Sequence, residues 1–283
     1  MSQGITVANA FAFACLALRN NIEAINSLNV FPVPDGDTGT NMFLTMQAAT
    51  EHLGDQYKEP EVPTVVDVLS WIATGALLGA RGNSGVLLSQ FLQGLASGYA
   101  DSIEESGKNP GEVDSEALCA AFARGTAIAY SALSEPVEGT ILTIMRGTSE
   151  RAWEVYQSGE YDVLVILEEC VGAASALLQA TPDMLAKLRE AGVVDAGGQG
   201  MVVILDAVRE YFLAEAFDSE VSIASLPIPE VQGVSPFQWH TDASTGEDYG
   251  YCTEFIVVGQ NIDRIQLRTE IESGGDSAIV VGD

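Results

Sequence analysis

Apolar residues recur every three to four positions along the chain up to Phe217, and short loops rich in Gly, Pro, Asp and Asn separate the repeating segments. This spacing predicts amphipathic α-helices that each bury one face. No strand-like alternation of apolar and polar residues occurs in this part of the sequence. The predicted helices cover residues 5–28, 39–53, 64–78, 85–99, 114–133, 140–157, 161–179, 182–190 and 198–217. We therefore expect residues 1–217 to form an all-α barrel or bundle of about eight amphipathic helices.

The pattern changes after Phe217. Residues 218–248 contain Pro227, Pro229 and Pro236 among many small polar residues, which is typical of a linker. Residues 249–283 begin with a β-branched and aromatic run, continue with the helical segment IQLRTEIESGG, and end in a second apolar run. They predict a short α+β fragment that is too small to bury a core by itself. We expect this fragment to be the truncated start of a second, middle domain.

The chain is strongly acidic, with 40 Asp and Glu residues against 12 Lys and Arg residues and a formal net charge of -28. Such a surface repels DNA, RNA and anionic lipid, so nucleic-acid binding is excluded as its main task. Hydrophobic residues make up 47% of the chain, which is enough to fill a core. The composition therefore argues against general disorder.

Cysteine usage and the apolar N-terminus both favour a cytoplasmic protein. None of the four cysteines lies in a CxxC pair, and buried reduced thiols explain them most simply. No Lys or Arg precedes the apolar segment 5–18 and no small-residue cleavage site follows it, so it predicts a buried first helix rather than a signal peptide. No apolar run reaches the roughly 18 to 20 residues that a membrane span needs. We therefore expect no integral membrane segment.

Four predicted helices begin in glycine-rich segments that also carry hydroxyl, amide or acidic side chains. The segments are PDGDTGTNM, GARGNSGV, EGTILTIM and DAGGQGMV. Glycine lets a ligand approach the backbone closely, and a helix start offers about four N–H groups and roughly half a positive charge. Taken singly, each segment is better explained as an ordinary cap or turn. Four of them in one helical chain favour a polyphosphate site built from converging helix starts.

The segment NVFPVPDGDTGTNM carries the most specific signal. Asp35 and Asp37 flank Gly36, so two carboxylates can point into one small volume. Mg²⁺ prefers one or two carboxylates together with phosphate oxygens and water. Asn29 and Asn41 are close enough in sequence to add further oxygen ligands. An Asp-Gly turn that caps a helix is the alternative, but such a turn needs one aspartate rather than two. We therefore favour a metal site.

The scarcity of cations makes a divalent metal necessary for any nucleotide bound here. No lysine occurs in the four glycine-rich segments, and the P-loop pattern GxxxxGK[ST] is absent from the sequence. Positive charge must then come from metal ions, from helix starts, and from Arg81 or Arg146. Each of these arginines can alternatively pair with a surface acid. His52 and His240 have no Ser or Cys partner in a recognisable nucleophile motif, so no hydrolytic triad is predicted.

The segments LNVFPVPDGDTGTNM, GARGNSGVLLSQ, GTILTIMR and GVVDAGGQGM, in this order and spacing, closely resemble the ATP-binding domain of the bacterial fatty acid kinase catalytic subunit. That domain is similar to the DhaL-type nucleotide subunit of dihydroxyacetone (glycerone) kinases. The resemblance covers about residues 5–217, and residues 249–283 look like the start of the family's middle domain. It implies a DhaL-like barrel of helices with ATP bound at one end.

The resemblance also implies which residues form the site. Asp35 and Asp37 would hold Mg²⁺ and serve catalysis. Asn29 lies near the position of a third aspartate in dihydroxyacetone kinases and is expected as a further metal ligand. Thr38 stands where those kinases have a histidine, which favours the fatty acid kinase side. The expected nucleotide contacts are Thr38, Gly39, Thr40, Asn41, Ser84, Gly85, Gly139, Thr140, Asp195 and Gly197.

The implied reaction is magnesium-dependent transfer of the ATP γ-phosphoryl group to a fatty acid, which a separate DegV-type carrier protein presents, to give an acyl phosphate. Two alternatives stay open: a non-catalytic nucleotide-binding module and a dihydroxyacetone kinase-type nucleotide subunit. A homodimer is a further option. The family's middle domain continues with an HVH-type motif that joins a cysteine at a metal. The chain ends before such a motif, so we expect Cys252 to bind no metal.

Overall fold

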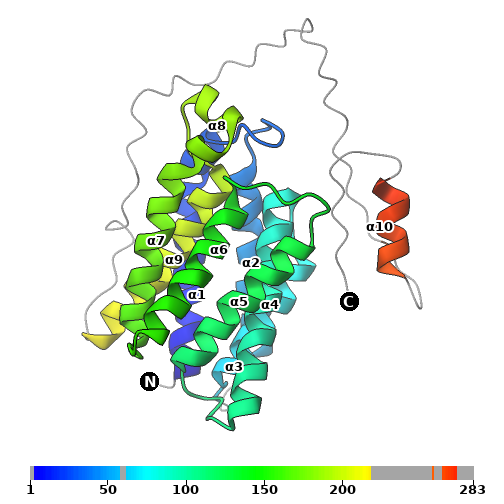
Figure 1. Cartoon of the computed structure of the whole chain (residues 1–283). Coiled ribbons are helices and arrows are strands. Elements are labelled where there is room, and N and C mark those ends of the chain that lie inside the picture. The colour runs from blue at the N-terminus through cyan, green and yellow to red at the C-terminus, as the bar shows by residue number, and fades with distance from the viewer. Residues whose placement is uncertain (1–2, 58–61, 218–256, 258–262, 273–283) are drawn as a thin grey trace, which may run out of the picture.

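The computed structural model describes residues 3–57, 62–217, 257 and 263–272. These residues form ten α-helices and no β-strand (Figure 1). The helices are α1 (Gln3–Ser27), α2 (Thr38–Gln56), α3 (Val65–Leu78), α4 (Gly82–Ser106), α5 (Ser115–Ser131), α6 (Ile141–Gln157), α7 (Val163–Met184), α8 (Ala186–Ala191), α9 (Ala196–Ala216) and α10 (Arg264–Glu272). The prediction of an all-α domain is therefore confirmed.

The long helices close into a ring. Helices α1 to α7 pack side by side in chain order, and α9 packs against both α7 and α1. The short helix α8 joins α7 to α9 at one end of the bundle (Figure 1). The barrel of about eight amphipathic helices that the periodicity predicts is thus the arrangement observed.

The up-and-down order of the helices gathers four connections at one end of the barrel. Helices α1, α3, α5 and α7 run toward this end, and α2, α4, α6 and α9 run away from it (Figure 1). The starts of the latter four helices are the glycine-rich segments of the sequence. Segments that are up to about 160 residues apart in the chain therefore meet at the same end of the fold.

Local sequence explains where several helices begin and end. Thr64 and Asp67 form a reciprocal capping box at the start of α3, with bonds of 3.0 and 3.1 Å. Asp114 and Asp162 cap α5 and α7 with side-chain oxygens that accept from first-turn N–H groups. Gly107, with a φ of 64°, ends α4 in the left-handed conformation that glycine adopts without steric cost. Each cap of this kind stabilises its helix by about 1 kcal/mol.

The observed helix ends differ most from the predicted ones at the C-termini of α4 and α7. Helix α4 continues past residue 99 to Ser106, with Ile103 buried in the core, and it ends at Gly107. Helix α7 passes through Pro182 to Met184. A proline in the last turn removes one backbone donor, and the N–H of Leu185 still donates to the carbonyl of Thr181 at 3.0 Å. The segment 182–190 is therefore divided between α7 and α8.

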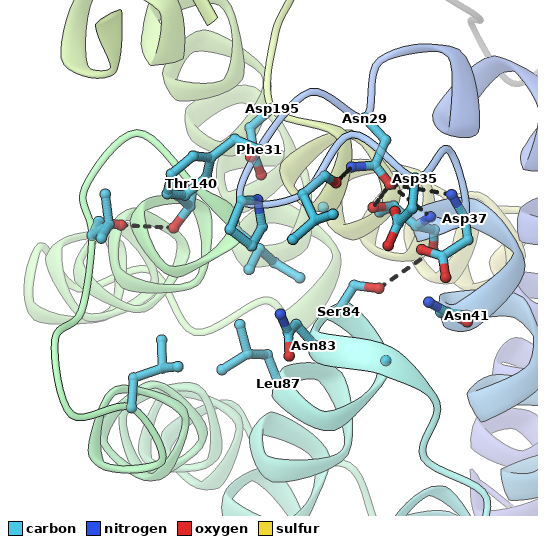
Figure 2. A pocket seen from close by; sticks show the side chains of 18 of the residues that line it. Asn29, Phe31, Asp35, Asp37, Asn41, Asn83, Ser84, Leu87, Thr140 and Asp195 are labelled. Carbon is cyan, nitrogen blue, oxygen red and sulfur yellow. Dashed lines mark hydrogen bonds between the residues drawn. The ribbon is translucent and has the colours of Figure 1, made fainter. Parts of the chain in front are cut away.

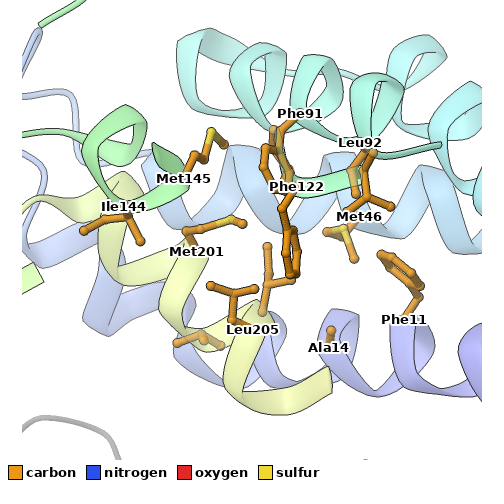
Figure 3. Close-up of a cluster of buried hydrophobic side chains, with 14 of the residues drawn as sticks. Phe11, Ala14, Met46, Phe91, Leu92, Phe122, Ile144, Met145, Met201 and Leu205 are labelled. Carbon is orange, nitrogen blue, oxygen red and sulfur yellow. The ribbon is translucent and has the colours of Figure 1, made fainter. Parts of the chain in front are cut away.

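Large apolar side chains line the barrel interior. Phe11, Met46, Phe91, Phe122 and Met201 come from five different helices and meet near the barrel axis (Figure 3). All five are at least nine-tenths buried. Burying a side chain of this size contributes about 1.5–3 kcal/mol, so the shared interior supplies the main force that holds the ring closed.

The described cysteines are buried free thiols. Cys15, Cys119 and Cys170 lie within the helical barrel. Burial raises the pKa of Cys119 and of Cys170 to about 12, so both thiols stay protonated and unreactive near neutral pH. The prediction of buried thiols is confirmed for these three residues, whereas Cys252 lies outside the described residues.

Two described helices, α1 and α7, are long and apolar enough to cross a membrane by length and composition alone. The sequence-based expectation that no apolar segment reaches this length does not hold under that criterion. Both helices are walls of the barrel, and core helices of water-soluble folds meet the same criterion, so this finding is weak evidence for a span. The expected absence of an integral membrane segment stays a prediction.

In the C-terminal part the structure describes Val257 and the ten residues 263–272. Helix α10 confirms the helical segment predicted in that region. The predicted linker 218–248 and the two predicted strands within 249–283 lie outside the described residues, apart from Val257. The domain boundaries proposed from the sequence therefore stay predictions.

Candidate functional site

A cavity of about 410 Å³ opens at the barrel end where the four connections meet. Asp35 and Asp37 lie on one side of it, and Thr140 and Asp195 lie on the other (Figure 2). Ser84, at the start of α4, faces the space between them (Figure 2). The lining residues are Asn29, Phe31, Pro32, Val33, Asp35, Asp37, Thr38, Asn41, Arg81, Gly82, Asn83, Ser84, Leu87, Leu133, Glu135, Val137, Thr140, Ile141, Asp195 and Gly197.

The acidic turn before α2 presents its two carboxylates without using them as helix caps. Gly36 has a φ of 69°, which lets the backbone reverse between Asp35 and Asp37. Asp37 is the N-cap residue of α2, yet its side chain makes no capping hydrogen bond. The simple alternative for an Asp-Gly turn, that its aspartate caps the next helix, is therefore not what the structure has.

Two asparagines of the α1–α2 region cap α2 instead. The Oδ1 atom of Asn29 accepts from the N–H of Asp37 at 3.2 Å, from the N–H of Thr38 at 3.1 Å, and from the Thr38 hydroxyl at 2.7 Å. The Oδ1 atom of Asn26 accepts from the N–H groups of Gly39 at 2.7 Å and Thr40 at 3.2 Å. The first backbone donors of α2 are thus consumed inside the protein, and none of these four is left for a phosphate.

The charge of the acidic pair is partly suppressed in the structure. The pKa of Asp35 is raised to about 6, and the largest cause is partial burial of its carboxyl group. The residue as a whole is exposed. The negative charge of Asp37 and a hydrogen bond between the two carboxyl groups are the next causes. A divalent cation between the two groups would remove this repulsion.

The donor set fits magnesium that arrives with a nucleotide. Among the residues that the structure describes, no group of three or more His, Cys, Asp or Glu side chains is placed to hold a metal. Two carboxylates beside an open cavity match the coordination preference of Mg²⁺, which retains water and phosphate oxygens among its ligands. Asn29 is 7% exposed, and its oxygen already accepts three hydrogen bonds. Its geometry is that of a residue that shapes the acidic turn.

The start of α4 has the opposite character. Its N-cap residue, Arg81, makes no side-chain capping bond, and the first bond within the helix runs from the N–H of Gly85 to the carbonyl of Arg81 at 3.0 Å. Within the described part of the chain, the N–H groups of Asn83 and Ser84 have no acceptor, and both residues line the cavity. The side chain of Ser84 makes one long contact of 3.5 Å to the carbonyl of Thr38. This helix start has donors to offer an anion.

A buried aspartate ties the starts of α6 and α9 together. The Oδ2 atom of Asp195 accepts from the N–H of Gly198 at 2.7 Å, and the carboxylate also interacts with the backbone N–H of Ile141. Burial raises the pKa of Asp195 to about 7, and these two backbone donors oppose the rise. The Thr140 hydroxyl accepts from the N–H of Leu142 at 3.4 Å and donates to the carbonyl of Val137 at 2.7 Å. Both side chains fix backbone at the cavity wall.

Several glycines of the motifs make room for neighbouring helices. A Cβ atom on Gly85 would collide with Thr45 of α2, and one on Gly39 would lie 2.6 Å from the carbonyl oxygen of Ile22 in α1. Neither glycine lines the cavity. In the structure these two glycines allow close packing between helices, and their role in ligand approach stays a prediction.

The structure separates the two arginines that the sequence left as candidates for positive charge. Arg146 pairs with Glu138 at 3.0 Å and Glu150 at 3.1 Å, and it does not line the cavity. Arg81 lines the cavity and forms no ion pair with the described residues. Its Nη1 atom donates to the carbonyl of Ala80 at 3.1 Å. Arg81 is thus placed to contribute positive charge to this cavity, and Arg146 is not.

Most of the residues expected at the site from the sequence do meet at this cavity. Those that line it are Asn29, Asp35, Asp37, Thr38, Asn41, Ser84, Thr140, Asp195 and Gly197. Four expected nucleotide contacts lie behind the lining, namely Gly39, Thr40, Gly85 and Gly139. Their expected contacts with a nucleotide stay predictions, and in the structure their neighbours are other parts of the protein.

An apolar wall was not foreseen from the sequence. It consists of Phe31, Leu87, Leu133, Val137 and Ile141, which come from the loop before α2, from α4, from the α5–α6 connection and from α6. Apolar side chains beside a polar end suit a ligand with an aromatic base and a charged tail. The sequence signal was weak, because each residue continues a helical period or sits in a short loop.

Comparisons with known proteins cover nearly the whole chain. Residues 32–210 match the DAK2 domain, and residues 248–283 match the middle domain of FakA-like fatty acid kinase proteins. An uncharacterized protein of Staphylococcus aureus (strain bovine RF122 / ET3-1) is 37% identical over 272 residues, which are 94% of this chain and 46% of the relative. A protein of the USA300 strain is 36% identical over 273 residues with the same coverage. The chain therefore spans about half the length of these relatives.

Among solved structures, the dihydroxyacetone kinase of C. freundii in its native form is 20% identical, with a TM-score of 0.48. The match covers 72% of this chain and 34% of that protein. The family assignment rests on the sequence matches, since the DAK2 match alone covers more than half of the residues. The chain belongs to the DAK2 domain family, and it carries the start of a FakA-like fatty acid kinase middle domain.

Proposed function

We propose that this chain is a magnesium-dependent phosphotransferase domain that binds ATP in the cavity at the barrel end. We further propose that it transfers the γ-phosphoryl group to a fatty acid, so that an acyl phosphate is formed. The family membership and the middle-domain match support the kinase class and the fatty acid side of the family. The chemistry of the cavity walls supports the nucleotide and the metal.

One observation carries the proposal. Asp37 occupies the N-cap position of α2, but Asn26 and Asn29 supply the capping oxygens in its place. Because capping does not occupy the carboxylates of Asp35 and Asp37, they are left beside the cavity in a costly like-charged pair. Such a pair is retained where it has a cation to bind.

The proposed roles follow from the position of each wall. Asp35 and Asp37 would hold Mg²⁺, which would supply charge neutralisation for the phosphate groups of the nucleotide. The N–H groups of Asn83 and Ser84, which have no acceptor among the described residues, would hold phosphate oxygens from the start of α4. The apolar wall around Phe31 takes the base and excludes water from it.

For a fatty acid acceptor, the protein mainly has to position the carboxylate. A fatty acid carboxylate is already ionised near pH 7, so no strong general base is needed to activate it. Transfer then depends on alignment and on charge stabilisation at the metal end of the cavity. We propose that a separate DegV-type fatty-acid-binding protein presents the acid, as the resemblance of the sequence motifs to the fatty acid kinase family implies.

The proposal is tested with the whole chain and titration calorimetry. We expect ATP to bind in the presence of Mg²⁺ and to lose most of its affinity when EDTA removes the metal. With a fatty-acid-loaded carrier added, hydroxylamine should trap the acyl phosphate as a hydroxamate. Nucleotide affinity that does not respond to EDTA, or no nucleotide binding at all, would contradict the proposed function. Metal-dependent binding without hydroxamate would leave a nucleotide-binding module without transferase activity.

A further inference from the structure

Arg81 lines the cavity with an anchored backbone and a guanidinium that forms no ion pair with the described residues. It is the N-cap residue of α4, and its N–H donates to the Thr45 hydroxyl of α2 at 3.2 Å. Its side chain is exposed, and the one hydrogen bond that it makes to the described residues goes to the carbonyl of its neighbour Ala80 at 3.1 Å. The backbone is therefore fixed, whereas the charged end can turn toward a ligand.

Arg81 differs in charge from the rest of the cavity lining. Among the described residues that line the cavity, Arg81 is the only positively charged side chain, and four carboxylates belong to the same lining. Those carboxylates are Asp35, Asp37, Glu135 and Asp195. Lys108, Arg146, Arg151 and Arg209 each pair with at least two carboxylates, whereas Arg19, Arg124, Lys187 and Arg189, like Arg81, form no ion pair with the described residues. Arg81 is thus a cation beside acids that it does not neutralise.

The neighbours of Arg81 place it at the metal end of the cavity. A Cβ atom on the next residue, Gly82, would collide with the side-chain amide of Asn41. Asn41 in turn donates its N–H to the carbonyl of Asp37 at 2.8 Å. Arg81 therefore lies beside the first turn of α2, at the exposed rim of the cavity that Asp35 and Asp37 also line. Thr140 and Asp195 lie on the far side (Figure 2).

An anionic acceptor needs a positive charge at this rim to offset repulsion, whereas a neutral acceptor does not. A hydroxyl group approaches a phosphoryl group without net charge, whereas a carboxylate is repelled both by the phosphoryl group and by the acidic lining. A guanidinium matches a carboxylate in shape and charge through two parallel N–H···O bonds. Building on the proposed function, we propose that Arg81 binds the acceptor's carboxylate at the rim and so makes the site selective for acids over alcohols.

The test compares two acceptors that have the same chain and different charge. Wild-type protein, Arg81→Met, Arg81→Lys and the control Arg124→Met are loaded with Mg²⁺ and a non-hydrolysable ATP analogue, and octanoate and octan-1-ol are titrated by calorimetry. Arg124 lies on α5 and does not line the cavity. We expect Arg81→Met to weaken octanoate binding by about tenfold, the size of one lost charged hydrogen-bonding partner, and to leave octan-1-ol binding as in the wild type.

Arg81→Lys should retain part of the preference for octanoate, because it keeps the charge and loses the two-bond geometry. Equal octanoate affinity in wild type and Arg81→Met would overturn the inference, as would a wild type that binds octanoate no better than octan-1-ol. The same titrations report the affinity for the ATP analogue. Failure of the wild type to bind Mg²⁺ and the analogue would reject the proposed function itself, whereas normal nucleotide binding with no role for Arg81 would reject this inference alone.

Discussion

The starts of α2 and α4 look alike in sequence and differ in chemistry. Both are glycine-rich and carry hydroxyl and amide side chains, and both face the same cavity. At α2 the first N–H groups are consumed by Asn26 and Asn29, and two carboxylates are left unused by the cap. At α4 no side chain caps the helix, and the N–H groups of Asn83 and Ser84 have no acceptor in the described part of the protein.

This difference assigns opposite partners to the two helix starts. The start of α2, where the N–H groups are already capped and the two carboxylates serve no cap, presents net negative charge and suits a cation. An uncapped helix presents N–H donors and partial positive charge and suits an anion. A metal nucleotide, which carries both, can lie between them. A glycine-rich helix start therefore cannot be assigned a ligand until the partners of its first N–H groups are known.

The largest expected effect comes from removing the negative charge at α2. Asp37→Asn should weaken Mg²⁺-dependent ATP binding by at least about 100-fold and remove phosphoryl transfer, because it deletes one of the two proposed carboxylate ligands. The thermal unfolding temperature should stay close to that of the wild type, because the Asp37 side chain makes no capping bond. Calorimetric titration and thermal unfolding check the two expectations.

The matched control for this variant is Asp55→Asn, an exposed aspartate near the end of α2 with no described side-chain contact. It should leave both measurements unchanged. Unaltered ATP affinity in Asp37→Asn would end the interpretation of α2 as the cation side. A large loss of stability would instead show that the carboxylate caps the helix after all.

The second prediction concerns the asparagine that frees those carboxylates. Asn29→Ala should lower the free energy of unfolding by about 1–3 kcal/mol, because it leaves the buried N–H of Thr38 without its acceptor. Mg²⁺ affinity should fall as well, since the acidic turn loses its anchor. Urea unfolding and metal titration are the measurements.

Asn29→Asp separates an anchor from a metal ligand. If the residue anchors the turn, aspartate loses the 2.9 Å bond that the Asn29 amide donates to the carbonyl of Val33, and Mg²⁺ affinity falls. If the residue is itself a ligand, a third carboxylate strengthens Mg²⁺ binding. Tighter binding by Asn29→Asp would therefore restore the assignment of Asn29 as a metal ligand.

The smallest expected effect lies on the far wall and depends on pH. The pKa of Asp195 is raised to about 7 in the folded protein from an ordinary value of 3.8, so the folded state holds a proton there that the unfolded state has lost. Between about pH 4 and pH 7 the folded state binds more protons, and stability falls as the pH rises through this window. Asp195→Asn should flatten this slope, by on the order of 2 kcal/mol between pH 5 and pH 8.

Urea unfolding at several pH values measures this slope, and the slope is a better readout than absolute stability, because asparagine also loses one acceptor oxygen. Asp162→Asn changes an exposed capping aspartate of α7 and should keep the wild-type slope. Identical pH dependence in wild type and Asp195→Asn would show that Asp195 is ionised throughout the range.

Much of this protein follows from contiguous sequence. The helical period predicts the helices of the barrel, and their ends differ chiefly where polar turns extend α4 and where Pro182 lies inside α7. The Asp35–Asp37 pair stands out because spacing and residue type are visible in a single segment. The apolar wall with Phe31 and Leu133 was missed, since residues brought together from separate loops leave no common local pattern.

The sequence by itself determined the helical architecture, the acidic pair and the family, because periodicity and short motifs are properties of neighbouring residues. The tertiary structure alone decided which helix start has donors to spare and which arginine reaches the cavity. Asn29 satisfies donors eight and nine positions along the chain, and Arg146 finds an acid eight positions before it. Hydrogen-bond and ion-pair partners of this kind are chosen by packing in three dimensions, so the charge of the finished site emerges only when the barrel closes.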